Sequence, residues 1–244
     1  MRILTDHTKP VRRPRLGLHP FLAFSALTLP ALLLLIFFFD QPIAWYFHAH
    51  GGWAASFFGA LTRGADTGHE ALMSRVAGVP FIFWALGLAY VVGRWVLQRR
   101  SATLFLVLLL THECSMVLAR VLKGAVHRLR PEVLFGSGYE GSGLWASGPH
   151  NDSFPSYHTA VYWSLFLPLA AAFPWLRVPL LIFPVLVGLG RLVLGAHYLS
   201  DVWASVWLVA LCTTVFRQLF KTHLAVVPEL LEEEEEEAAE AVLE

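Results

Sequence analysis

The sequence predicts an all-α protein, an integral membrane bundle of six transmembrane helices with an additional interfacial helix. Of its 244 residues, 56% are hydrophobic and only 15% are charged, which is more apolar than a soluble domain of this length needs. The apolar residues gather in runs that approach the length of about 20 residues with which a helix crosses a bilayer. Basic residues follow several of these runs, as is typical of the cytoplasmic ends of membrane helices.

The charge of the chain is unevenly distributed. The 18 basic and 18 acidic residues balance to a net charge of zero, but nine of the acidic ones lie in residues 229–244. The remaining chain is basic, so we expect anionic lipids as substrates and partners, and no nucleic acid. We divide the chain into a basic cytoplasmic N-terminus (residues 1–18), a six-span membrane domain (19–222) and an acidic cytoplasmic tail (223–244).

The first predicted span is the uncharged run Phe21–Phe39, which is too long for the apolar core of a cleaved signal peptide. At roughly 1.5 Å per residue it crosses most of a bilayer core that is about 30 Å thick. Residues 43–61 are rich in aromatic side chains but contain His48, His50 and two glycines, which favours an interfacial helix. The other five spans are predicted at Val76–Gly93, Thr103–Leu122, Thr159–Trp175, Val178–Gly190 and His197–Phe216.

Three polar islands interrupt the apolar sequence: island one is residues 123–131, island two is 151–159 and island three is 191–201. Six spans with both termini in the cytoplasm place the basic turns between spans inside, as the positive-inside rule requires. Island one follows the third span, island two precedes the fourth, and island three joins the fifth and sixth. All three islands are therefore expected on the extracytoplasmic face, where they form one site.

Two histidines in the islands carry the predicted chemistry. His197 and Asp201 are four residues apart at a helix start, so they share a face and can form a hydrogen bond. A carboxylate bound to one imidazole nitrogen leaves the other free as a nucleophile. His158 stands at a helix N-terminus, whose free N–H groups attract a phosphate, and it is the predicted general acid and base.

Cations in the same islands are expected to bind the phosphate oxygens. Lys123 and Arg130 are seven residues apart, close to one helical face, and Arg191 comes from island three. With three cations stabilising the charge, the predicted chemistry needs neither a metal nor another cofactor. His127 and Arg128 are candidates for auxiliary substrate contacts, with a plain surface position as the alternative.

The order and spacing of these residues resemble the PAP2 superfamily, the type 2 phosphatidic acid phosphatases. The family pattern K-x6-RP, PSGH and SR-x5-H-x3-D is matched by Lys123 with Arg130-Pro131, by Pro155-Ser156 with His158, and by Arg191 with His197 and Asp201. The resemblance covers roughly residues 70–216. It implies six membrane spans and a metal-independent phosphatase of lipid phosphates or pyrophosphates, with Ser156 among the phosphate-binding residues.

Two positions depart from the family pattern. Tyr157 stands where the family usually has glycine, and is a candidate for a substrate contact that narrows the pocket. Gly190 stands where the family usually has serine, which removes one hydroxyl from the expected phosphate site. Neither change touches a cationic or titrating group, so the catalytic interpretation stands.

The leading hypothesis is a phosphatase of the cytoplasmic (inner) membrane that works at the extracytoplasmic face through a phosphohistidine intermediate. The candidate substrates are anionic phospholipids such as phosphatidic acid and phosphatidylglycerol phosphate, polyprenyl pyrophosphate, and lipid A phosphates. Two alternatives remain open. One is a phosphotransferase that moves phosphate from polyprenyl pyrophosphate to another lipid. The other is a non-hydrolytic lipid binder or transporter in which Tyr157 closes the pocket.

Overall fold

A computed structural model describes residues 18–139 and 141–220, and these residues are almost entirely helical. Two irregular helical segments extend α1 and α4, a two-stranded hairpin separates α3 from α4, and short 3-10 turns precede α5 and α8. The helices are α1 (Leu18–Leu34, continued by the π-helical segment Leu35–Phe39), α2 (Asp40–His50), α3 (Gly52–Met73), α4 (Phe81–Val91, continued by Val92–Val96), α5 (Thr103–Val126), α6 (Pro131–Ser137), α7 (Tyr157–Ala172), α8 (Arg177–Val193) and α9 (Leu199–Leu219). The strands are β1 (Arg75–Val76) and β2 (Val79–Pro80).

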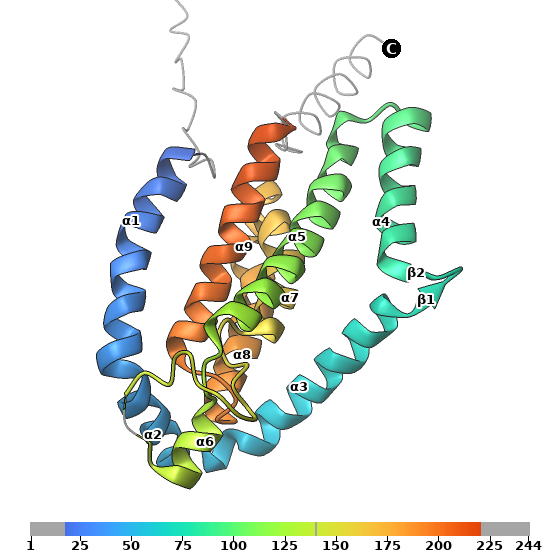
Figure 1. Cartoon of the computed structure of the whole chain (residues 1–244). Coiled ribbons are helices and arrows are strands. Elements are labelled where there is room, and N and C mark those ends of the chain that lie inside the picture. The colour runs from blue at the N-terminus through green and yellow to red at the C-terminus, as the bar shows by residue number, and fades with distance from the viewer. Residues whose placement is uncertain (1–17, 140, 221–244) are drawn as a thin grey trace, which may run out of the picture.

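Helix α7 lies at the centre of the bundle, where it packs against α5, α8 and α9. The remaining long helices lie around this group: α1 packs on α9, α3 on α8, and α4 on α5 (Figure 1). Small or β-branched side chains fill the contact zone, including Ala119, Ala160, Val187 and Val209, which are fully buried. Small residues let helix backbones approach closely, which is how helices associate within a membrane.

Within residues 18–139 and 141–220, four helices are long and apolar enough to cross a membrane: Leu18–His50, Arg100–Ser137, Pro174–Val193 and Leu199–Leu219. The apolar helix Phe81–Val96 is shorter. Many large apolar side chains on the outer surface are exposed, among them Leu27 on α1 and Leu88 on α4. A surface of this kind fits contact with lipid. The expected all-α class with membrane-spanning helices is therefore confirmed, and the number of six spans stays a prediction.

Two predicted boundaries are wrong. The second apolar helix begins at Phe81 rather than Val76, because Ala77 and Gly78 both have positive φ (53° and 80°) and form the turn of the β1–β2 hairpin. Residues 43–61 do not form one helix but lie in α2 and α3, which meet at Gly51. A side chain at Gly51 would place its Cβ 2.5 Å from the carbonyl oxygen of Phe47, so this junction requires glycine.

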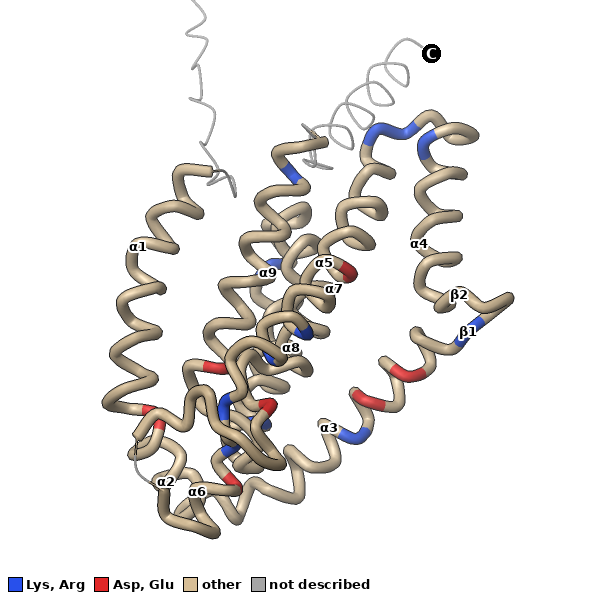
Figure 2. The backbone as a smooth tube through the Cα atoms, in the orientation of Figure 1, with Lys and Arg blue, Asp and Glu red and all other residues tan. Residues whose placement is uncertain are grey.

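The two ends of the described chain lie at the same end of the bundle, where α1 begins and α9 ends (Figure 1). The opposite end carries α2, α6 and the long loop between α6 and α7. Figure 2 shows basic residues at the turn between α4 and α5 and a mixed group of acidic and basic residues at the opposite end. The predicted acidic tail (223–244) and residues 1–17 of the predicted basic N-terminus lie outside the described residues.

Candidate active site

Residues from all three polar islands meet at the end of the bundle that carries α2 and α6 (Figure 1). They come from three helices and two loops, which the tight packing of α5, α7, α8 and α9 brings together. Lys123 lies in the last turn of α5, Arg130 immediately before α6, His158 in the first turn of α7, Arg191 in the last turn of α8, and His197 in the loop before α9.

These side chains are close enough to interact electrostatically. Lys123 interacts with Arg130 and Arg191, and both histidines, His158 and His197, interact with Lys123 and Arg191. The positive charges of Lys123, Arg130 and Arg191 repel each other in this partly buried site, and an anion bound between them would relieve that repulsion. The structure therefore places residues of all three islands close together, and their use as one anion-binding site stays a prediction.

Asp152, which sequence reasoning missed, orients two of the three cations. Its two carboxylate oxygens accept hydrogen bonds from Nε and Nη2 of Arg130, each at 2.8 Å, and its backbone carbonyl accepts from Nζ of Lys123. Burial alone would raise the pKa of Asp152, but the hydrogen bonds and charge of Arg130 outweigh it and hold that pKa below 3.8. Arg191 differs, since its Nε is buried and has no hydrogen-bond partner within the described residues. An anionic ligand that reached this donor would satisfy it.

The tautomer of His197 follows from a contact that was not expected. Its Nδ1 lies 2.8 Å from the backbone carbonyl oxygen of Ser153. A carbonyl only accepts hydrogen bonds, so Nδ1 carries the proton and Nε2 keeps its lone pair. His197 is 3% exposed, so this orientation is fixed by its surroundings.

The predicted hydrogen bond between His197 and Asp201 is not formed. Their nearest polar atoms, Nδ1 and Oδ2, are 3.8 Å apart, which leaves an electrostatic contact. The reason is local: α9 begins at Leu199 with Tyr198 as its N-cap, so His197 precedes the helix and does not share a helical face with Asp201. Oδ2 of Asp201 instead accepts from the hydroxyl of Ser153 at 2.6 Å and from the N–H of Tyr198 at 2.8 Å.

The pKa of His197 predicts a pH profile. Burial lowers this pKa to about 4, against the attraction of Asp201 and with the help of Lys123 and Arg191. A nucleophilic imidazole must be neutral. His197 is neutral above about pH 4, and its neutral form is lost as the pH falls through that value. We expect protonation of His197 to lower kcat/KM, corrected for ionisation of the substrate phosphate, about tenfold per pH unit below about pH 4. An acid limb centred near the ordinary imidazole pKa, about 6.5, would contradict it.

Arg128 is a structural residue, which corrects both of its sequence-based interpretations. It is 1% exposed, so it lies neither at the surface nor against a substrate. Its Nη1 donates to Asp201 Oδ1 at 2.7 Å and to Ser200 Oγ at 2.6 Å, and its Nη2 donates to Asp40 Oδ2 at 2.7 Å. The guanidinium carbon also lies 4.3 Å from the centre of the Tyr198 ring. Arg128 thus ties the junction of α1 and α2 to the start of α9.

The structure also corrects the role of Ser156. Its Oγ accepts from the hydroxyl of Thr159 at 2.9 Å and caps α7, and the residue is fully buried. Its hydroxyl therefore cannot reach a phosphate. Tyr157 is half-buried against the central apolar cluster, and His127 is exposed at the end of α5, where its Nδ1 lies 3.3 Å from Nδ2 of Asn151.

Gly190 packs closely against α3. A Cβ at this position would lie 3.0 Å from Cδ1 of Phe58 on α3, closer than apolar carbons ordinarily approach. A serine would therefore require the Phe58 side chain to shift by a few tenths of an ångström. The glycine allows α3 to lie beside the turn of α8 that carries Arg191.

Comparison with known proteins supports the resemblance to the PAP2 superfamily that the sequence motifs indicate. Residues 100–224 match the sequence profile of the PAP2 superfamily. A lipid A 1-phosphatase of Rhizobium johnstonii is 33% identical over 114 residues, which cover 44% of this chain and 47% of that protein. A lipid A 1-phosphatase of Rhizobium etli is 32% identical over 114 residues, 44% of this chain and 49% of that protein. The chain spans about half the length of the curated relatives it matches. No solved structure matches it significantly.

Proposed function

The chain belongs to the PAP2 superfamily, and from that premise we propose that it is a metal-independent membrane phosphatase that hydrolyses a lipid phosphate or pyrophosphate. The observation that carries the proposal is the state of His197. Its Nδ1 proton is held by the Ser153 carbonyl, so the lone pair of Nε2 is available in a site with three cations. A neutral imidazole beside fixed positive charge suits attack on a phosphate.

In the first step, Nε2 of His197 attacks phosphorus in line with the bond to the lipid. The new P–N bond forms as the P–O bond breaks, and the electron pair of the broken bond goes to the lipid oxygen. His158 gives a proton to that oxygen, which makes the lipid alcohol or phosphate a stable leaving group. Lys123, Arg130 and Arg191 bind the phosphoryl oxygens, whose charge the buried site would otherwise disfavour.

In the second step, water hydrolyses the phosphohistidine. His158, now neutral, takes a proton from the water as its oxygen attacks phosphorus, and the P–N bond breaks. The electron pair returns to Nε2 of His197, and inorganic phosphate leaves. Asp201 stays ionised throughout, because Arg128 and two further donors hold its oxygens, and its charge stabilises the positive imidazole of the intermediate.

A lipid A type phosphate is the favoured substrate. The two relatives reported above are lipid A 1-phosphatases, and their similarity to this chain extends over 114 residues. Other anionic phospholipids and polyprenyl pyrophosphate share the reacting group and remain candidates. All of them present a phosphate at a membrane surface, where the loops at the α2 and α6 end can bind it.

The proposed setting is the inner membrane, crossed six times by α1, α4, α5, α7, α8 and α9, with α2 and the start of α3 at the interface. An even number of spans places both termini on one side, and α1 begins where α9 ends (Figure 1). Arg94, Arg99 and Arg100 lie at that same end, which favours a cytoplasmic position for it. The site then faces the extracytoplasmic side.

The test is phosphate release by the purified protein in detergent with EDTA present. The panel contains lipid A, phosphatidic acid, phosphatidylglycerol phosphate and a polyprenyl pyrophosphate. We expect release from at least one of them, and from lipid A first. No release from any, or release that requires an added divalent metal, would contradict the proposal. Transfer of phosphate to a second lipid in a mixed sample identifies a phosphotransferase instead.

A further inference from the structure

Helix α3 contributes a carboxylate to the site, although it lies outside the region that matches the family. Nε2 of His158 and Oδ1 of Asp66 are 3.0 Å apart, a hydrogen-bonding distance. Both side chains are partly exposed, at 32% for His158 and 38% for Asp66, so they face the same open space.

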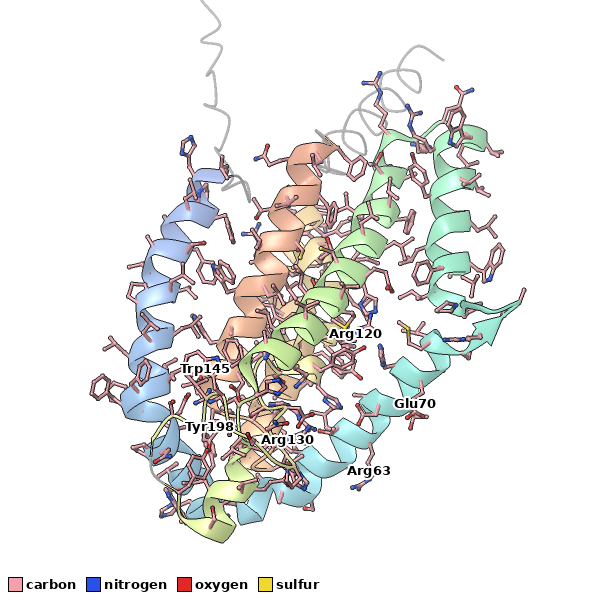
Figure 3. All side chains as sticks on the ribbon, in the orientation of Figure 1. Arg63, Glu70, Arg120, Arg130, Trp145 and Tyr198 are labelled. Atoms are coloured by element: carbon pink, nitrogen blue, oxygen red, sulfur yellow. The ribbon has the colours of Figure 1, made fainter. Side chains whose placement is uncertain are left out.

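The position of α3 is fixed by close packing. Ala65, the residue before Asp66, is buried in the central cluster with Met116 of α5 and Ala160 of α7. Two turns earlier, Phe58 packs closely against Gly190 of α8, where a Cβ would lie 3.0 Å from its ring. The contacts on both sides hold Asp66 beside the first turn of α7. Arg63 and Glu70 of the same helix lie on its outer side, away from the bundle (Figure 3).

The contact assigns a role to each nitrogen of His158. A carboxylate only accepts hydrogen bonds, so Asp66 holds the proton on Nε2 and leaves Nδ1 for proton transfer. The charged and titratable groups that face His158 are Asp66 and His69 of α3, Lys123 of α5 and Arg191 of α8. Of these, Asp66 is the one negative group among the described residues that interact with His158.

We propose that Asp66 is a positioning residue for His158, so that α3 completes the active site. The inference rests on the proposed phosphatase function. In the first step, the Nδ1 proton of His158 passes to the lipid oxygen while Asp66 keeps its charge and its hold on Nε2–H. In the second step, Nδ1 takes a proton from the attacking water. The carboxylate thereby keeps one imidazole orientation through both transfers.

The test compares two phosphate monoesters that differ in how much they need an acid. Dioctanoyl phosphatidic acid releases a basic alkoxide oxygen and depends on protonation, whereas 4-nitrophenyl phosphate releases a weakly basic phenolate that needs none. For Asp66→Asn, we expect the first-turnover rate with the phosphatidic acid to fall about 100-fold, the lower end of the effect of a positioned acid. The first-turnover release of 4-nitrophenol is expected to change little.

The ratio of the two rates, measured on one sample, does not depend on how much of the variant is folded. Asp66→Glu keeps the carboxylate and is expected to recover part of the phosphatidic acid rate. Glu70→Gln removes an exposed carboxylate one turn further along α3, and is expected to leave both rates unchanged.

An equal loss with both monoesters, or no loss with either, overturns the role of Asp66 while the wild type remains a phosphatase. Inactivity of the wild type on these probes and on the lipid panel overturns the proposed function itself, and this inference with it. The two failures are therefore distinguishable.

Discussion

Replacement of His197 by glutamine is expected to lower phosphate release by about 10⁴-fold or more, to the background left by the cations alone. Glutamine is close to histidine in volume and fits this buried position without opening a cavity. Its amide can donate to the Ser153 carbonyl as Nδ1 does, but it offers no nucleophilic nitrogen. The measurement is turnover of the best lipid of the panel, with the protein in the same detergent.

His50→Gln is the matched control, because His50 is exposed on α2, where its Nδ1 lies 3.0 Å from the carbonyl oxygen of Tyr46 and its ring stacks on the Tyr46 ring. It should retain wild-type turnover. If His197→Gln kept more than about one tenth of the wild-type rate, His197 could not be the nucleophile.

Replacement of Arg128 by methionine is expected to destabilise the fold by about 3–5 kcal/mol, the usual cost of removing one partner of a buried ion pair. The guanidinium lies between two buried carboxylates, those of Asp40 and Asp201, at 2.7 Å from each. Methionine fills a similar volume but leaves both buried carboxylates without a cationic partner. A thermal unfolding midpoint in detergent measures the loss, and activity is expected to disappear with it.

A second substitution tests the cause. Asp40→Asn in the Arg128→Met background removes one of the two unpaired charges, so part of the lost stability should return. Activity should not return, because Asp201 still lacks the donor that fixes it beside His197. An Arg128→Met protein as stable as the wild type would show that this cation does not hold the α1–α2 junction to α9.

Much of this fold could be predicted from composition and periodicity. Apolar runs of sufficient length identify membrane helices because an unpaired backbone cannot lie in hydrocarbon, and the predicted third, fifth and sixth spans each fall on one helix. The spacing of Lys123 and Arg130, and of Arg191 and His197, identified groups that the bundle brings together. Lys and Arg residues on the face expected to be extracytoplasmic break the positive-inside pattern, and charges near the membrane are costly. Such residues therefore indicate a functional site.

The remainder depends on contacts between residues far apart in the chain. Asp40 and Arg128 are 88 residues apart in sequence, and no local pattern joins them. The same holds for Asp66 and His158, which are 92 residues apart in sequence. The hydrogen bond predicted between His197 and Asp201 failed because a spacing of four matters only inside a helix, and α9 begins after His197.

The central claim is that phosphate passes through His197. The most direct measurement is mass spectrometry of protein quenched in alkali during turnover of 4-nitrophenyl phosphate, with His158→Ala used to slow hydrolysis of the intermediate. A phosphoryl group on His197, absent from the same sample of His197→Gln, is the predicted result. A phosphoryl group on any other residue, or burst release of 4-nitrophenol with no phosphorylated protein, would contradict the account.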